Sequence, residues 1–438
     1  MSADHRSGGN SKAATITKTL AAVGAGALVV RLVRFGFEVF GPTRPFKLQD
    51  SDVSPESDHF ASCLSLATDA LLYRDTQIQV LRNGKEFYPA EFTAIESARQ
   101  SINLEAFEFF EGEITTEIIH RLCERARSGV EVRLIVDRFG SWNTKKRYFE
   151  QLVNAGGRMI FYHPVDFRNL SRLDNRTHRK MLIIDGRIGF IGGAGFADHW
   201  FKETKGKPAW RDTVLRVEGG VAASLNATFS QNWAAATGEI LFSKRQFPNA
   251  PDSGGKTAMV IMSTPGYGGT RARILFQALI ESARCTIHIT SPYFLPDRNA
   301  RHALMRAARD RNVEVCVLTN GVNGDHPSVR RLSRVMSTKL IRAGVDYYEY
   351  QPGMIHAKLL TIDGLWTIAG STNFDNRSFA LNDEVNIAIC DREVTSIIDR
   401  QFHDDLQPSE CVSPRELEHQ NLSSELLADA AWVLRREE

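Results

Sequence analysis

The sequence predicts an α/β protein that contains two similar domains. Segments typical of helices alternate with apolar, β-branched runs typical of strands. Three helix–strand segments of the first half recur in the second half. Such alternation is typical of a mixed or parallel sheet covered by helices. Two copies with matching faces can pack around a pseudo-twofold axis, although the sequence alone does not prove that they do.

The composition is that of a globular chain: of 438 residues, 42% are hydrophobic, 9% aromatic and 24% charged. These values exclude a wholly disordered, collagen-like or small disulfide-rich protein. The net charge of +2 gives no overall field that would indicate a nucleic-acid partner. Six cysteines occur without a CxxC pair or a metal-ligand spacing, which suits a reducing compartment.

Residues 1–57 are predicted to be a membrane-associating segment followed by a linker. The apolar stretch at 19–30 carries no charge, but it is shorter than the roughly 20 apolar residues that a spanning helix needs. Arg31 and Arg34 follow, and they could reach lipid headgroups while neighbouring apolar side chains enter the bilayer. We therefore expect contact with the cytoplasmic membrane and leave full spanning open. The alternative is a helix that packs on the protein's own core.

The repeat sets the domain boundaries. Equivalent segments recur at a near-constant offset: 94–109 with 279–294, 126–136 with 308–318, and 154–164 with 342–352. A repeat this long indicates duplicated domains rather than a short-period solenoid. We predict a first domain at 58–248, a second at 256–410 and a C-terminal tail at 411–438. The Pro- and Gly-containing stretch at 244–256 is the predicted joint.

A motif that can carry chemistry ends each half of the repeat. Both copies follow the pattern His-x-Lys-x4-Asp: His178, Lys180 and Asp185 in the first, then His356, Lys358 and Asp363 in the second. One chance match in a chain of this length is expected about 0.05 times. Two matches at equivalent points of an independent repeat are therefore not accidental. These six residues form the predicted catalytic set.

Strand geometry divides the six residues between two roles. Side chains two positions apart in a strand share a face, so each His and its Lys are expected to project together. Asp185 and Asp363 lie an odd number of positions from their histidines, and each precedes a glycine between two apolar strands. Asp-Gly in this setting is typical of a hairpin turn. We interpret both aspartates as structural, capping the turn or binding nearby backbone, and assign the reaction to the histidines and lysines.

Small and polar residues follow each predicted hairpin. In the second half, Ser371 and Asn373 would add side-chain donors near an anionic group. The first half has Gly193 and Gly195 at the equivalent positions, preceded by Gly192. Backbone N–H groups can approach an anion closely at such residues. Gly192 and Gly193 taken alone are better explained as a strand end packed tightly on a helix.

A carboxylate is usually needed to fix the tautomer of a catalytic histidine. Asp212 and Glu384 are candidates, because they follow His178 and His356, respectively, at comparable distances along the chain. The alternative for Asp212 is a surface salt bridge with Arg211.

Two histidines, two lysines and nearby polar donors suit a phosphate ester. One imidazole can attack phosphorus and form a phosphohistidine, while the other protonates the leaving alcohol and later deprotonates the acceptor. The lysines would balance the charge of the phosphoryl oxygens. No acidic cluster accompanies the motif, so we expect no metal and no other cofactor.

The duplicated HxKxxxxD motif resembles that of the phospholipase D (PLD) superfamily, and within it the sequence is more similar to bacterial cardiolipin synthases. The similarity covers about residues 78–406 and includes the stretches SPYFLPD, HAKLLTIDG, GSTNFDNRSFALNDE and WRD. The resemblance implies two α/β/α sandwich domains packed with pseudo-twofold symmetry around one shared active site. It also implies a phosphatidyltransferase that passes a phosphatidyl group between phosphatidylglycerol molecules through a phosphohistidine, releasing glycerol and forming cardiolipin.

The resemblance further implies how the site is assembled. Glu384 is expected to pair with His178 and Asp212 with His356, with His178 as the nucleophile. Gly195 departs from the family, which usually has Asn there, so one amide donor to the phosphate is missing. The implied partners are a phospholipid substrate and the membrane surface.

Two other activities fit the same motif. A hydrolytic phospholipase D, which forms phosphatidic acid, would need the same residues. A nuclease is the third candidate, since a nucleic-acid backbone is also a phosphodiester. It would use the basic stretch formed by Arg330, Arg331, Arg334, Lys339 and Arg342. These residues occupy more than one face of a helix, so we interpret them as a solvated surface and expect no nucleic-acid partner.

Overall fold

The computed structural model describes residues 48, 53–162, 176–248, 255–265 and 270–418. The predicted membrane segment at 19–30, part of the joint and the end of the C-terminal tail lie outside the described residues. Within the described part of the chain, no helix is long and apolar enough to cross a bilayer.

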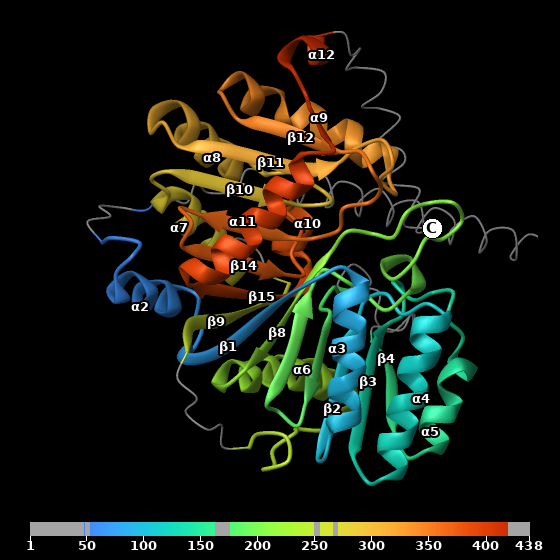
Figure 1. The fold of residues 1–438 in the computed structure, drawn as a ribbon. Helices are drawn as coiled ribbons and strands as arrows, with labels where there is room; N and C mark the ends of the chain where they lie inside the picture. The colour runs from blue at the N-terminus through green and yellow to red at the C-terminus, as the bar shows by residue number, and fades with distance from the viewer. Residues whose placement is uncertain (1–47, 49–52, 163–175, 249–254, 266–269, 419–438) are drawn as a thin grey trace, which may run out of the picture.

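The first half alternates strands and helices (Figure 1). Its elements are α2 (Asp58–Ala67), β1 (Leu72–Arg82), α3 (Gly84–Ser97), β2 (Ser101–Ala106), α4 (Glu113–Arg127), β3 (Glu131–Asp137), η1 (Lys146–Phe149), α5 (Glu150–Asn154), β4 (Arg158–Tyr162), β5 (Arg176–Thr177), β6 (Met181–Ile184), β7 (Ile188–Gly192), η3 (Asp198–Trp200), β8 (Thr213–Glu218) and α6 (Gly220–Thr237).

The second half repeats this alternation. Its elements are β9 (Lys256–Ser263), α7 (Arg271–Ser282), β10 (Thr286–Thr290), α8 (Arg298–Asp310), β11 (Glu314–Asn320), α9 (Pro327–Arg342), β12 (Asp346–Tyr350), β13 (Leu359–Ile362), β14 (Trp366–Gly370), α10 (Asn376–Ala380), β15 (Asn382–Cys390), α11 (Arg392–Leu406), β16 (Ser409–Cys411) and α12 (Pro414–Glu418).

One continuous sheet runs through both halves. Its strand order is β16-β12-β11-β10-β13-β14-β15-β9-β1-β8-β7-β6-β2-β3-β4, with β5 paired beside β15. The strands β2, β3 and β4 run parallel, as do β10, β11 and β12, and in each half a hairpin lies antiparallel next to them. The equivalent topology of the halves confirms the predicted duplicated α/β fold. The halves join where β1 pairs with β9.

Among the described residues, the three largest of four hydrophobic clusters fill the space between the sheet and its helices. One lies within the first half and a second mainly within the second half. The third contains side chains from both halves, among them Phe229 and Trp233 of α6 and Val385 of β15. This shared cluster fixes the orientation of the halves, because burial of apolar surface favours close contact between them. Phe60 and Leu64 of α2 join the cluster of the second half, although we predicted this helix within the first domain.

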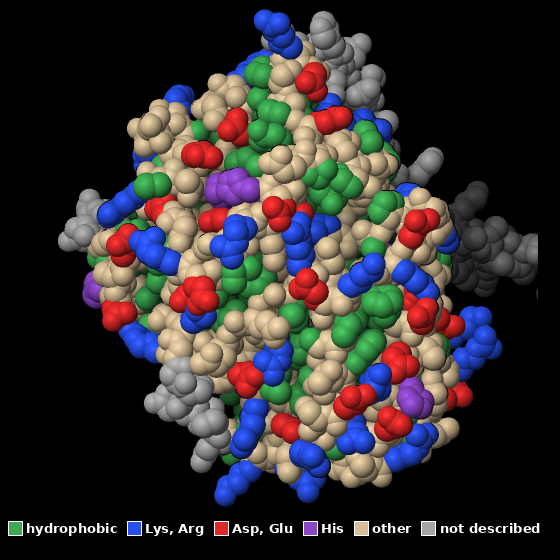
Figure 2. Space-filling view, viewed as in Figure 1, with side chains coloured by type: hydrophobic (Ala, Val, Ile, Leu, Met, Phe, Trp, Pro, Cys, Tyr) green, Lys and Arg blue, Asp and Glu red, His purple; other side chains and the backbone are tan. Residues whose placement is uncertain are grey.

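The surface is mixed in character. On the face shown in Figure 2, hydrophobic, basic and acidic side chains are interspersed over both halves. This pattern agrees with the near-neutral net charge of +2.

Both motif aspartates lie in the hairpin turns. Asp185 and Gly186 have φ of 54° and 64°, and Asp363 and Gly364 have φ of 53° and 60°. Positive φ at two successive positions is the geometry of a type I′ turn, which Asp-Gly favours.

The carboxylates of these turns bind the backbone at the start of a neighbouring strand. Asp185 accepts hydrogen bonds from the N–H groups of Arg99, Gln100 and Ser101 at 2.7–3.2 Å. Asp363 accepts the equivalent bonds from residues 284–286 at 2.7–2.9 Å. Both aspartates therefore tie a hairpin to the start of β2 or β10, at the end of the sheet opposite the histidines. This placement supports the structural interpretation of the two residues.

We expect Asp185→Asn to lower stability without altering the chemistry. Its amide cannot accept the same set of charge-assisted bonds, so the free energy of unfolding should fall by about 1–3 kcal/mol. Thermal denaturation and turnover per folded molecule would be measured together. Asp363→Asn is the matched variant and should behave alike. Loss of turnover at an unchanged melting temperature would contradict the structural role.

Candidate active site

The motif histidines and lysines lie in two short connections where the halves meet. Residues 178–180 precede β6 and residues 356–358 precede β13. The strands begin directly after each lysine, so the prediction that His and Lys belong to the strand is wrong. The backbone of each histidine pairs with the opposite half instead. The side chains still lie together in the second copy, where Lys358 Nζ is 3.1 Å and 3.2 Å from the ring nitrogens of His356.

Each histidine contacts a carboxylate that comes from the other half. His178 Nδ1 lies 3.0 Å and 3.1 Å from the two carboxylate oxygens of Glu384. His356 Nδ1 lies 2.9 Å from Asp212 Oδ2. All four side chains are buried. The structure thus brings together the two pairs that the resemblance implied, and Asp212 is not a surface residue.

The backbone repeats the same crossed arrangement. His178 N–H donates to the carbonyl of Asp383 at 2.9 Å, and β5 pairs with the start of β15. His356 N–H donates to the carbonyl of Arg211 at 2.7 Å, beside an isolated bridge between Arg211 and Ile355. Each histidine is therefore held through both its main chain and its ring by the segment that carries its carboxylate.

The protonation of the pairs follows from their burial. Burial lowers the pKa of His178 to about 4, against the opposing charge of Glu384. Burial and the charge of Lys358 lower the pKa of His356 to about 3. Burial alone would raise the pKa of both carboxyl groups, but the histidine and lysine contacts hold each one below its usual value. In the free protein each pair is a neutral imidazole beside a carboxylate. An Nδ1–H bonded to that carboxylate leaves Nε2 as the reactive nitrogen.

The two lysines share one electrostatic environment. Burial and the charge of Lys358 lower the pKa of Lys180 to about 7. Burial lowers the pKa of Lys358 to about 8, although Asp212 and Glu384 raise it. Lys180 also lies over the ring of Phe107, 5.2 Å from its centroid. Two ammonium groups held close together in a buried site favour the binding of an anion.

Further side chains support the two carboxylates. Ser371, which we predicted as a donor to an anion, donates its hydroxyl to Glu384, and Asn382 Nδ2 donates to the same carboxylate at 3.3 Å. In the other pair, Trp200 Nε1 donates to Asp212 Oδ2 at 3.0 Å. Sequence reasoning missed Trp200 because it lies on η3, at a position that the repeat does not match, so no pattern marks it.

The glycines of the first half lie where a larger side chain would clash with its neighbours. A Cβ at Gly193, the equivalent of Ser371, would lie 2.7 Å from Asp212 Oδ1. A Cβ at Gly192 would lie 2.5 Å from the carbonyl of Thr213, so this residue packs against β8 rather than against the predicted helix.

Gly195 is crowded in the same way. A Cβ there would approach the carbonyl of Glu108 to 2.9 Å and Trp200 Cη2 to 3.1 Å. An asparagine would therefore require the Glu108 backbone and Trp200 to move. Its counterpart Asn373 is buried, and among the described residues its Oδ1 has no hydrogen-bond partner.

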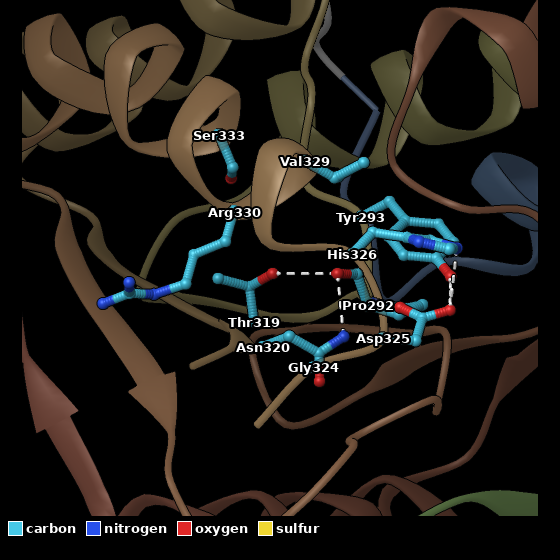
Figure 3. A pocket seen from close by; sticks show the side chains of 10 residues that line it. All are labelled: Pro292, Tyr293, Thr319, Asn320, Gly324, Asp325, His326, Val329, Arg330 and Ser333. Atoms are coloured by element: carbon cyan, nitrogen blue, oxygen red, sulfur yellow. Dashed lines mark hydrogen bonds and ion pairs between the residues drawn. The ribbon is translucent and has the colours of Figure 1, made fainter. Parts of the chain in front are cut away.

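A polar cluster from the second half lies close to His356. Tyr293 Oη donates to Asp325 Oδ2 at 2.6 Å, and His326 Nε2 lies 3.0 Å from the same oxygen (Figure 3). These residues line a small hollow. Burial would raise the pKa of Asp325, but His326, Tyr293 and the charge of His356 hold it below its usual value. The cluster is therefore within electrostatic reach of the site, and sequence reasoning missed it too.

Metal ligands do not gather here. Across the residues that the structure describes, no group of three or more His, Cys, Asp and Glu side chains is arranged to hold a metal ion. The site instead offers two imidazoles, two ammonium groups and hydrogen-bond donors. This set can bind a phosphodiester and provide both a nucleophile and a general acid.

Comparison with known sequences identifies a family for both halves. Residues 92–233 and 276–406 match the family described as "Cardiolipin synthase, PLD-like domain". The chain is 32% identical over 377 residues to the probable cardiolipin synthase YwiE of Bacillus subtilis, covering 84% of this chain and 75% of that protein. It is 35% identical over 335 residues to the cardiolipin synthase of Geobacillus thermodenitrificans, covering 76% of this chain and 66% of that protein.

Solved structures share the fold. The phosphatidylserine synthase of Haemophilus influenzae matches with a TM-score of 0.66 and 14% identity, over 86% of this chain and 98% of that one. The polyphosphate kinase of Porphyromonas gingivalis matches with a TM-score of 0.54 and 15% identity, over 82% of this chain and 53% of that one. At these identities the likeness shows the fold alone.

We expect Trp200→Phe to reduce turnover, because it removes the indole donor to Asp212 and loosens the carboxylate that holds His356. A hydrogen bond to a charged group contributes about 1.5–3 kcal/mol, so a loss of about 10- to 100-fold in kcat is expected. Trp366→Phe is the matched control, since its indole is equally buried but donates to the carbonyl of Pro55 instead. Equal kcat values for the two variants would contradict the role given to Trp200.

Proposed function

The chain belongs to the family of cardiolipin synthases with PLD-like domains, and we propose that it is a phosphatidyltransferase that forms cardiolipin from phosphatidylglycerol. One observation carries the proposal. Two imidazoles, each oriented by a carboxylate of the other half, lie beside two buried lysines. The substrate class of this family is phospholipid, and the activity belongs to phospholipid biosynthesis.

In the first step His178 Nε2 attacks the phosphorus of one phosphatidylglycerol. A P–N bond forms while the P–O bond to the headgroup glycerol breaks, and His356 gives its proton to the leaving oxygen. The pKa of His356 is low in the free site because burial and Lys358 disfavour the imidazolium. A bound phosphodiester brings a negative charge that opposes this effect, so His356 takes up a proton from solvent when the substrate binds and then acts as the acid.

In the second step the headgroup hydroxyl of another phosphatidylglycerol attacks the phosphohistidine. His356 takes the hydroxyl proton, a P–O bond forms and the P–N bond to His178 breaks. The products are cardiolipin and free His178. Lys180 and Lys358 stabilise the charge on the non-bridging oxygens in both steps, and Asn373 and Ser371 are proposed as supporting residues.

The basic stretch on α9 supports lipid over nucleic acid. Arg330 and Arg334 both bind the buried Glu349, at 2.6–2.9 Å. Because these two guanidinium groups pair with a carboxylate of the protein itself, the stretch has less positive charge with which to bind a phosphate backbone. We propose that the protein works at the cytoplasmic membrane, with residues 1–57 as its membrane-associating segment and linker.

We expect His178→Ala and His356→Ala each to lower kcat by at least about a thousandfold, with no further loss in the double variant, because the two residues act as a unit. Purified protein would be incubated with short-chain phosphatidylglycerol, and the lipids read by mass spectrometry. The wild type should form cardiolipin and glycerol in equal amounts. Phosphatidic acid as the main product would indicate a phospholipase D instead, and cleavage of oligonucleotides without lipid turnover would indicate a nuclease.

The pH dependence of kcat/KM should report the ionisation of Lys180, Lys358 and His178. In the free enzyme the pKa of Lys180 is about 7 and that of Lys358 about 8, so kcat/KM should fall as pH rises through this range and charge on the lysines is lost. It should fall again as pH drops through about 4, where His178 gains a proton. Lys180→Arg, whose guanidinium stays protonated, should move the alkaline limb upward. A kcat/KM that rises between pH 7 and 9 would contradict the assignment.

A further inference from the structure

Two loops beside the site expose large apolar side chains. The loop after β3 exposes 44% of Phe139 and 68% of Trp142, and the loop after β11 exposes 60% of Val322. Single exposed apolar side chains are common, whereas a group of them beside a site is a candidate binding surface. The guanidinium of Arg176 lies 4.9 Å from the centroid of the Phe139 ring, whereas Trp142 is the most exposed of the three.

The two loops occupy equivalent places in the halves. Phe139 stands two positions after the end of β3, and Val322 stands two positions after the end of β11. Asp137 at the start of one loop accepts a hydrogen bond from Thr177 N at 3.1 Å, directly before His178. Asn320 at the start of the other accepts from Ile355 N at 2.8 Å, directly before His356. Each loop is therefore anchored to the backbone next to one motif histidine.

Basic side chains accompany the more apolar loop. The segment 138–149 contains Arg138, Lys145, Lys146 and Arg147 and no acidic residue. Lys145, Lys146 and Arg147 follow Trp142 closely, and the two lysines and the arginine lie toward solvent. An aromatic residue next to lysine and arginine is the composition that binds the interface of an anionic bilayer, where the ring enters the headgroup region and the cations stay with the phosphates.

We infer that the loops at 138–147 and 321–324 are a docking surface that seats the mouth of the site on an anionic bilayer. The inference rests on the proposed function, because a lipid substrate keeps its acyl chains in the membrane while its phosphodiester reaches the histidines. Trp142 and Val322 enter the interface on either side of the site. The basic residues of the first loop attract the phosphatidylglycerol headgroups.

A second exposed apolar group lies at the opposite end of the first half and provides the control. Ile240 is 83% exposed and Phe242 is 92% exposed. The chain just after them packs beside the Asp185 turn, since a Cβ at Gly186 would lie 2.4 Å from the carbonyl of Gln246. If this end contacted the bilayer, the histidines would lie a full strand length away from it. The Ile240/Phe242 group and the Trp142/Val322 group are both apolar and exposed, but only the second lies beside the site.

The kinetic test compares vesicles with monomers. The double variant Trp142→Ser/Val322→Ser should turn over phosphatidylglycerol vesicles at least about tenfold more slowly than the wild type. On short-chain phosphatidylglycerol below its micelle concentration, its rate should be unchanged. The control Ile240→Ser/Phe242→Ser should match the wild type on both substrates. An unchanged vesicle rate for the first variant, or a slow one for the control, would overturn the inference.

A binding test that needs no turnover separates this inference from the proposed function. Vesicles of phosphatidylglycerol with brominated acyl chains quench tryptophans that enter the bilayer. The full-length wild type should be quenched more strongly than Trp142→Phe, which keeps an apolar ring but removes the reporter. Equal quenching of the two proteins would overturn the docking surface. If quenching differs but no cardiolipin forms from monomeric substrate, the docking surface stands and the proposed function fails.

The charges are tested with the same vesicles. Changing Lys145, Lys146 and Arg147 together to Gln should weaken binding to phosphatidylglycerol vesicles and leave binding to phosphatidylcholine vesicles unchanged. Changing Lys244 and Arg245 to Gln is the matched control at the opposite end and should have no effect. If vesicle binding fell more in the control than in the triple variant, the membrane would contact the end opposite the site, and the inference would be overturned.

Discussion

The hydrogen bond between each histidine and a carboxylate of the other half is the constraint on which the rest of the structure depends. Neither half contains a complete pair: His178 needs Glu384, and His356 needs Asp212. The site therefore exists only while the halves are docked. The pairing of β1 with β9 and the hydrophobic cluster shared by the halves maintain this contact. Duplication made this possible, because equivalent segments can meet across a pseudo-twofold axis.

The buried charges of the site act on one another in a direction that suits an anion. Burial lowers the pKa of both histidines and both lysines, and the charge of Lys358 lowers the pKa of the other three groups further. Two carboxylates offset part of this effect but face the Nδ1 side of the rings. In the proposed reaction, a phosphodiester that binds between the lysines supplies the missing negative charge. The electrostatics of the free site therefore favour binding of an anion.

The duplication predicts the fold and the motif predicts the histidines and lysines of the site, because the repeat and the motif can each be recognised from short stretches of sequence. The Asp-Gly turns were predicted for the same reason. Features that depend on contacts between distant parts of the chain could not be predicted from the sequence. Trp200 reaches Asp212 from η3, and the matching position of the second half is a serine, Ser378. The histidines leave the strand because their backbone pairs with the other half. The cluster around Asp325 forms from residues far apart along the chain.

The departures from symmetry give the two histidines unequal surroundings. This difference suits the proposed transfer, in which one histidine is neutral while the other carries a proton. Each lysine donates to the backbone carbonyl of its histidine, but Lys358 Nζ also contacts the ring of His356. Glu384 is held by the Ser371 hydroxyl, and Asp212 by an indole that lies next to Gly195. The missing asparagine at position 195 is then part of this difference, because Trp200 occupies the room that its side chain would need.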